Sequence, residues 1–129
     1  MTTGDGHRDV LLVAADLSER RLLYGELLEA GYDVLPVQGV ALALGNLLQK
    51  LAVPRLILLD ARDDPEVTPE SVRYLLNLVP GVLLILVVGS IDRAMWQPIE
   101  SQVSALLARP ITVGKIVEVV KEVLPLPSS

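Results

Sequence analysis

The sequence predicts a doubly wound α/β sandwich, in which helices cover both faces of a five-stranded parallel sheet. Four short runs of the chain are wholly apolar rather than alternating, as is typical of strands covered on both faces. Segments with helical spacing separate the runs, so strands and helices alternate along the chain. The first strand, its helix and a stop signal fit within about thirty residues, the span of a βαβ unit.

Each predicted strand precedes a predicted helix. The strands are expected at Val10–Ala14, Tyr32–Val37, Leu56–Leu59, Val82–Val88 and Ala105–Ala108. In the first helix, Ser18 is the expected N-cap and Gly31 the C-terminal stop. Its apolar face comprises Leu23, Leu27 and Ala30.

The remaining helices are recognised by their apolar faces and their end signals. A second helix ends before Pro54, and its expected apolar face is Val40, Leu44, Leu47, Leu48 and Leu51. A third is expected at Pro69–Leu78, closed by Pro80 and Gly81. A fourth, from Asp92 to Gln97, has a weaker pattern and is either limited by Pro98 or continues past it with a kink. Thr112 is the expected cap of the last helix, whose apolar face is Ile116, Val119, Val120 and Val123 and which ends at Pro125.

Length and composition fit one domain with a large core. The chain has 129 residues, of which 51% are hydrophobic. We expect a folded domain at residues 9–124 between tails at 1–8 and 125–129. No apolar run reaches the roughly 18 residues that a bilayer span requires, and the N-terminal segment is polar rather than a signal peptide. The sequence therefore predicts a cytoplasmic protein without a membrane contact.

Several functions are excluded by the residues that the chain lacks. Cysteine is absent, and the single histidine, His7, falls in the expected N-terminal tail. Zinc sites, disulfides and His-based triads are therefore not expected. The net charge is −5 and no basic cluster is present, which argues against direct nucleic-acid binding.

Ligands of doubly wound sheets bind beyond the C-terminal ends of the strands. The residues expected at that edge are Ala14–Asp16, Asp60–Asp64, Val88–Ser90, Arg109 and Pro110. This edge is therefore the candidate site.

Three segments carry a resemblance to a known family. They are LLVAADLSERRLLYGELLEAGYDV, LILLD and ESQVSALLARP. Together they resemble the receiver domain of two-component response regulators, from Val10 to about Leu124. The resemblance implies a flavodoxin-like fold and a role in phosphorelay signal transduction. It also makes Asp60 the phospho-acceptor candidate and puts Arg109 in the place of the family's phosphate-contacting lysine.

The metal-binding residues of that family are missing. Receiver domains place two acidic residues after the first strand to hold Mg²⁺, and Ala14 and Ala15 stand there. We therefore expect impaired phosphotransfer and no resident cofactor. Asp16 and Asp63 are the remaining candidates for a cation pocket with Asp60. The simpler explanation of Asp63 is that it is a turn-forming residue in a loop.

The other site residues also have two interpretations. Asp60 is either a phospho-acceptor or, as we favour, a structural residue that pairs with Arg109 or Arg62. Ser90 is the candidate hydroxyl for contact with a phosphoryl group. Leu106 stands where the family has an aromatic switch residue, and it has no polar tip to couple to that hydroxyl. We expect the two-state switch to be disabled.

An apolar group in the weak fourth helix and the last strand is a candidate interface. Its members are Met95, Trp96, Ile99 and Leu106. The alternative is that Trp96 is a core residue beneath the helix, because a large apolar ring is usually buried.

The sequence favours a pseudo-receiver that is not an enzyme and acts by binding proteins. The implied partners are a histidine kinase or an output protein, with a homodimer as a further option. One alternative is a phosphorylatable receiver with atypical metal ligation and Asp60 as acceptor. Others are a flavodoxin-like module that binds a small ligand and an interaction module unrelated to phosphorelay, although no glycine-rich phosphate loop follows the first strand.

Overall fold

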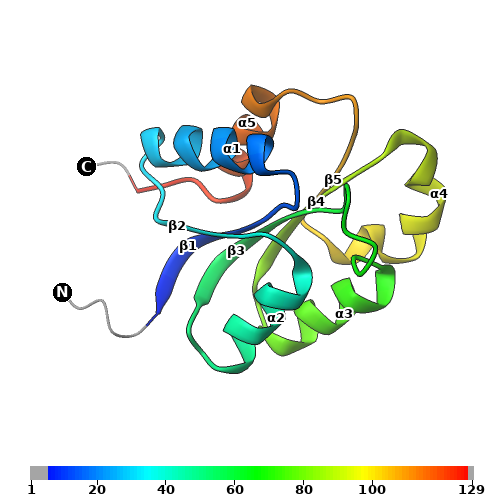
Figure 1. Cartoon of the computed structure of the whole chain (residues 1–129), viewed down its shortest axis with the longest axis horizontal. Coiled ribbons are helices and arrows are strands. Elements are labelled where there is room, and N and C mark those ends of the chain that lie inside the picture. The colour runs from blue at the N-terminus through cyan, green and yellow to red at the C-terminus, as the bar shows by residue number, and fades with distance from the viewer. Residues whose placement is uncertain (1–5, 128–129) are drawn as a thin grey trace.

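The five strands form one parallel sheet in the order β2-β1-β3-β4-β5 (Figure 1). The computed structural model describes residues 6–127. The strands are β1 (His7–Val13), β2 (Val34–Val37), β3 (Val53–Asp60), β4 (Leu83–Val88) and β5 (Ala105–Ala108). The expected doubly wound α/β fold is therefore confirmed.

The helices cover both faces of the sheet. They are α1 (Leu17–Glu29), α2 (Val40–Leu48), α3 (Pro69–Leu78), α4 (Arg93–Trp96) and α5 (Val113–Val123). Figure 1 shows α1 and α5 on one face, and α2, α3 and α4 on the other. Among the described residues, no helix has both the length and the apolarity to span a membrane.

The sheet separates two apolar cores, and β1 contributes to both. Val10 and Leu12 pack into the core beneath α1 and α5, whereas Leu11 and Val13 pack into the core beneath α2 and α3. All four side chains are fully buried. This two-sided burial explains why the strand is an unbroken apolar run in the sequence.

The first helix is capped by Asp16 rather than by Ser18. The Asp16 Oδ2 atom accepts a hydrogen bond from the Glu19 backbone N–H at 3.0 Å. A carboxylate at this position satisfies a free N–H and also complements the positive end of the helix dipole, which a hydroxyl does only in part. Gly31 has a φ of 99°, which confirms it as the residue that ends the helix.

The second helix is shorter than expected. Its buried residues are Val40, Ala43 and Leu47, whereas Leu48 and Leu51 are 56% and 59% exposed. The sequence prediction placed too many leucines on the buried face. A helix that is apolar around most of its circumference has no single apolar stripe that identifies the buried face.

The fourth helix is a single α-turn between two 3₁₀ segments, Ser90–Asp92 and Gln97–Gln102. Pro98 lies in the second segment and cannot donate a backbone hydrogen bond, which accounts for the loss of regular α-structure. In contrast, α3 has the expected bounds, and Thr112 caps α5 through the Lys115 N–H.

The N-terminal tail is shorter than predicted. His7 belongs to β1, where it pairs with Val53 of β3. The rest of the predicted tails falls partly outside the described residues, which exclude 1–5 and 128–129.

The cap assignment gives a prediction about stability. Asp16→Ala removes the cap and a surface ion pair, so the free energy of unfolding should fall by about 1–2 kcal/mol. Ser18→Ala should change it by less than about 0.5 kcal/mol, and Asp16→Asn should keep the cap. Urea denaturation followed by circular dichroism measures all three. A larger loss for Ser18→Ala than for Asp16→Ala would restore Ser18 as the cap.

Candidate functional site

Asp60 lies at the C-terminal end of β3 and is 3% exposed. Its Oδ2 atom accepts a hydrogen bond from the Arg109 Nη2 group at 2.6 Å. Its Oδ1 atom accepts one from the backbone N–H of Arg62 at 3.0 Å. The expected pairing of Asp60 with Arg109 is therefore confirmed, and both carboxylate oxygens have a donor.

A second buried carboxylate, that of Glu19, binds the same guanidinium. Glu19 lies in the first turn of α1 and is 8% exposed. Its Oε1 and Oε2 atoms accept hydrogen bonds from Nη2 and Nη1 of Arg109, the second at 3.2 Å. Arg109 thus bridges α1 and β3 from the end of β5. The sequence did not indicate Glu19 as a site residue, because acidic residues are common in the first turn of any helix, where they complement the helix dipole.

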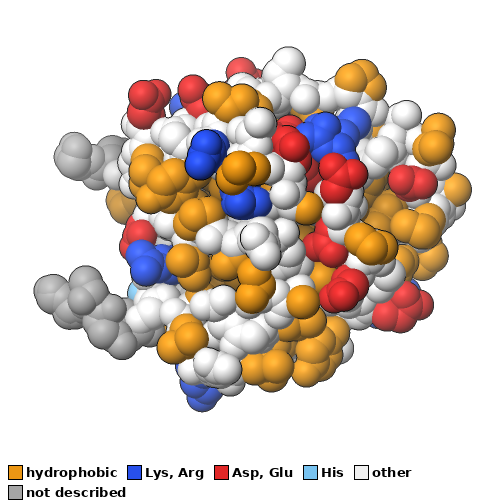
Figure 2. Space-filling view, viewed as in Figure 1, with side chains coloured by type: hydrophobic (Ala, Val, Ile, Leu, Met, Phe, Trp, Pro, Cys, Tyr) orange, Lys and Arg blue, Asp and Glu red, His pale blue; other side chains and the backbone are white. Residues whose placement is uncertain are grey.

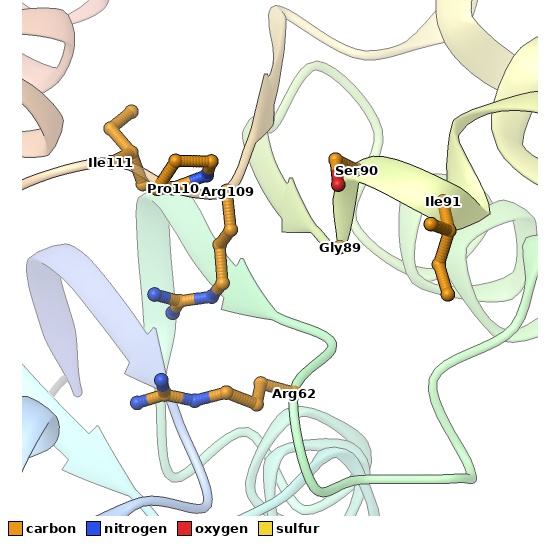
Figure 3. Close-up of a pocket in the computed structure, with 7 residues that line it drawn as sticks. All are labelled: Arg62, Gly89, Ser90, Ile91, Arg109, Pro110 and Ile111. Carbon is orange, nitrogen blue, oxygen red and sulfur yellow. The ribbon is translucent and has the colours of Figure 1, made fainter.

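Arg62 supplies a second guanidinium to the cluster. Its Nη2 group lies 3.2 Å from Asp16 Oδ2 and 3.2 Å from Glu19 Oε1. Figure 3 shows the Arg62 and Arg109 side chains coming from different segments, with their guanidinium groups near one another. Three carboxylates and two guanidinium groups therefore form one ionic cluster, defined here as Asp16, Glu19, Asp60, Arg62 and Arg109.

Burial and pairing shift the pKa values of the cluster in different directions. Desolvation raises the pKa of Asp60 above its ordinary value, and the Arg62 amide and the Arg109 charge reduce this effect without cancelling it. Burial also acts to raise the pKa of Glu19, but its hydrogen bonds and charge interaction with Arg109 outweigh burial and lower the pKa. Burial opposes the charge of Arg109, yet the two carboxylates raise its pKa, so it remains a cation.

The two positions after β1 contribute no side-chain ligand. Ala14 is fully buried, and the backbone oxygens of Ala14 and Ala15 accept hydrogen bonds from the Arg20 Nη1 group at 2.7 and 3.4 Å. A guanidinium therefore lies beside the backbone where the family has its acidic pair.

The cation pocket of Asp16, Asp60 and Asp63 is not assembled. Asp63 is exposed, has a φ of 61°, and lines a separate hollow with Asp64. Within residues 6–127, no group of three potential metal ligands is close enough to hold an ion. Asp16 is instead engaged with Arg62 and with the start of α1.

A hollow of about 550 Å³ opens beside the ionic cluster. Its lining comprises Arg62, Gly89, Ser90, Ile91, Arg109, Pro110 and Ile111 (Figure 3). Ser90 begins the 3₁₀ segment after β4, and Figure 3 shows it across the hollow from the two guanidinium groups. The structure thus brings Ser90 to the same hollow as Arg109 but not into contact with it.

The four interface candidates separate by burial. Trp96 is 1% exposed and Ile99 is fully buried, as the core interpretation requires. Met95 is 50% exposed, and Leu106 is a partly buried β5 residue that packs on the same core. These four residues do not form one exposed patch.

No family model and no curated protein matches the sequence. Solved structures do match. A structure titled adenylate cyclase from Rhodopirellula baltica has a TM-score of 0.76 at 22% identity, covering 92% of this chain and 87% of that one. The receiver domain of NtrX from Brucella abortus has a TM-score of 0.74 at 17% identity, covering 92% and 100%. A CheY-like receiver domain from Methanospirillum hungatei has a TM-score of 0.74 at 21% identity, covering 89% and 91%.

The fold follows from this likeness and from the strand order. The chain has the flavodoxin-like fold of response-regulator receiver domains. At these identities the likeness establishes the fold, and the chemistry of the site has to be argued from the residues.

Arg109 should be the most costly side chain of the cluster to remove. Arg109→Met leaves Asp60 and Glu19 buried without their cation, so the free energy of unfolding should fall by about 3–5 kcal/mol. Arg109→Lys should cost less, because it keeps the charge but cannot bridge both carboxylates. The exposed pair of Arg93 with Glu100 provides the control, since Arg93→Met should cost less than about 1 kcal/mol. Equal losses at Arg93 and Arg109 in urea denaturation would contradict the assigned role.

The raised pKa of Asp60 predicts how stability varies with pH. The folded protein keeps the Asp60 proton to a higher pH than the unfolded chain, whose pKa for this residue is near 3.8. The contribution of Asp60 to the free energy of unfolding therefore falls as the pH rises from that value through the folded pKa. Relative to Asp60→Asn, the wild type should be most stable at the acid end of this window. Urea denaturation from about pH 4 to pH 8 tests this, and a difference that grows with pH would refute it.

Proposed function

We propose that this chain is a receiver-like signalling domain that acts by binding other proteins and is not phosphorylated on Asp60. One observation carries the proposal. Both carboxylate oxygens of Asp60 accept hydrogen bonds from the chain's own donors, one from Arg109 and one from Arg62. A phosphoryl donor would have to displace these contacts to reach the carboxylate.

The residues present do not fit a magnesium ion. Mg²⁺ takes oxygen ligands, usually from one or two carboxylates together with water and phosphate. The three carboxylates of the ionic cluster are each bound to a guanidinium, and Ala14 and Ala15 offer no side-chain oxygen. Without a metal to neutralise charge, transfer of a phosphoryl group onto a carboxylate is strongly disfavoured.

A domain of this kind would work as a constant docking surface. A histidine kinase or an output protein is the implied partner, and a homodimer is the alternative. The proposal includes no enzymatic activity and a cytoplasmic location. It is supported by the receiver fold together with the absence of the acidic pair.

The test is phosphorylation of the purified chain by acetyl phosphate with Mg²⁺. Intact-mass spectrometry should find no added phosphoryl group, because the acceptor is paired and no metal site is available. A receiver domain that accepts phosphate from acetyl phosphate serves as the positive control in the same buffer. Beryllofluoride with Mg²⁺ should likewise leave the backbone amide spectrum unchanged.

Two variants complete the experiment. Asp60→Asn should behave like the wild type, because Asp60 takes no phosphate in either case. Ala14→Asp with Ala15→Asp restores the acidic pair and should increase Mg²⁺ binding. Labelling of the wild type that Asp60→Asn abolishes would refute the proposal and favour a phosphorylatable receiver with atypical metal ligation.

A further inference from the structure

The outward face of α1 is apolar at positions where a surface helix is normally polar. Leu22 and Leu28 are 60% and 44% exposed, and both lie outside the buried stripe formed by Leu23 and Leu27. Figure 2 shows hydrophobic side chains among charged ones on the part of the surface over α1. The core of the domain therefore does not account for these two exposed leucines.

Gly25 lies midway between the two leucines, and the fold does not require a glycine there. The residue is exposed, and a Cβ atom at this position would meet no atom within 4 Å beyond the adjacent backbone. A glycine inside a helix costs free energy relative to alanine, because it loses more backbone freedom on folding. A glycine on an outward face also lets a second backbone approach closely. The approaching backbone would have to come from outside this chain.

Two unpaired charges of opposite sign flank the same face. Arg21 and Glu29 lie four residues to either side of Gly25, and both are exposed. Within residues 6–127, neither has an opposite charge within ion-pair distance. The last turn of α1 contains no basic residue, although the helix dipole favours a cation at that end. Both side chains are therefore available to a partner molecule.

These residues are placed symmetrically about Gly25. With 3.6 residues per turn, the positions three and four residues to either side of Gly25 all lie within about 60° of it around the helix axis. In an antiparallel pair of α1 helices with a two-fold axis at Gly25, Leu22 faces the partner's Leu28. In the same pair, Arg21 faces the partner's Glu29. Each contact occurs twice, and each joins groups that suit one another.

We propose that α1 forms the interface of a symmetric dimer of this chain, in which the two α1 helices pack antiparallel with Gly25 on the two-fold axis. The two unpaired charges identify a second copy as the occupant, because the same symmetry that joins the leucines also pairs Arg21 with the partner's Glu29. The role of the dimer in signalling rests on the proposed docking function. Its formation does not depend on whether Asp60 takes phosphate.

The second helix provides a comparison within the same chain. On α2, Leu42 and Leu48 are 49% and 56% exposed, and Gly45 lies midway between them. The residues four positions to either side of Gly45 are Ala41 and Gln49, which carry no charge. The spacing of leucine and glycine is thus the same, but no charge pair specifies a second copy. We therefore assign the dimer to α1, and α2 supplies the control.

The size of the contact sets the expected affinity. One helix from each copy buries less than the roughly 1,200–2,000 Å² of a standard stable interface. We therefore expect a dissociation constant on the order of 100 μM. Sedimentation equilibrium of the purified chain from about 10 μM to 1 mM should show the average mass rising from that of one copy towards that of two. A chain that stays monomeric up to about 1 mM overturns the proposal.

Charge reversal tests the pairing itself. Arg21→Glu places like charges opposite one another at both contacts and should weaken dimerisation about tenfold. Arg93→Glu makes the same change in net charge on α4, on the other face of the sheet, and should leave the dissociation constant unchanged (Figure 1). Equal weakening by these two variants would show a general charge effect and overturn the interface.

Mixing two variants separates a lost contact from a folding defect. Glu29→Arg alone should also weaken dimerisation about tenfold. An equimolar mixture of the Arg21→Glu and Glu29→Arg proteins should dimerise as well as the wild type, because both contacts of the mixed dimer then join opposite charges. A variant that fails to fold cannot be rescued in this way. Two folded variants that stay monomeric when mixed would overturn the antiparallel arrangement.

The apolar part of the interface has its own variants. Gly25→Gln should raise the thermal midpoint of unfolding by a few degrees, because glutamine is the better helix former, and yet weaken dimerisation about tenfold by keeping the backbones apart. Leu22→Ser with Leu28→Ser should abolish the dimer, whereas Leu42→Ser with Leu48→Ser on α2 should preserve it. Equal losses from the two leucine pairs would overturn the assignment to α1. The assay contains no phosphoryl donor, so this proposal and the proposed function can fail separately.

Discussion

The bond network of the Arg109 guanidinium is the interaction on which the candidate site depends. Two carboxylates, Asp60 and Glu19, are almost removed from water, and isolated buried charges of that kind are prohibitively costly. A planar guanidinium has enough donors in a fixed fork to bind both at once. Because the partners come from α1, β3 and β5, this cation also fixes the relative positions of three elements at the C-terminal edge of the sheet.

The same network accounts for local features that look unrelated. The start of α1 is set by Asp16, which caps the helix and binds Arg62 through the same Oδ2 atom. That start puts Glu19 in the first turn, where it meets both arginines. A helix begun two residues later, at the expected Ser18 cap, would carry Glu19 in the position directly after the cap and lose the Asp16 capping bond. Helix geometry and site electrostatics therefore select the same residue as the cap.

The fold was predictable because most of its signals are local. Strands buried on both faces are apolar runs, and caps such as Thr112 act within one turn of helix. The Asp60–Arg109 pair was also predictable, since both residues follow strands that end at one edge of the sheet. Glu19 was not, because its burial depends on a partner 90 residues away, and neither residue alone indicates it. The buried face of α2 was predicted wrongly for a similar reason. The helix has more leucines than one face can hold, and only tertiary packing decides which of them are buried.

Charge balance explains how the site tolerates Ala14 and Ala15 at the two positions after β1. In a metal-dependent receiver, carboxylates around the acceptor are balanced by Mg²⁺. Here the balance is internal, with arginines in the place of the ion and Glu19 supplying a carboxylate from the helix. Under the proposed function, every carboxylate of the cluster is already bound by a guanidinium, so no phosphoryl group is taken up, and Leu106 offers no polar group to report one. On the same proposal, no phosphorylation changes the conformation, so partner choice resides in permanent features of the surface.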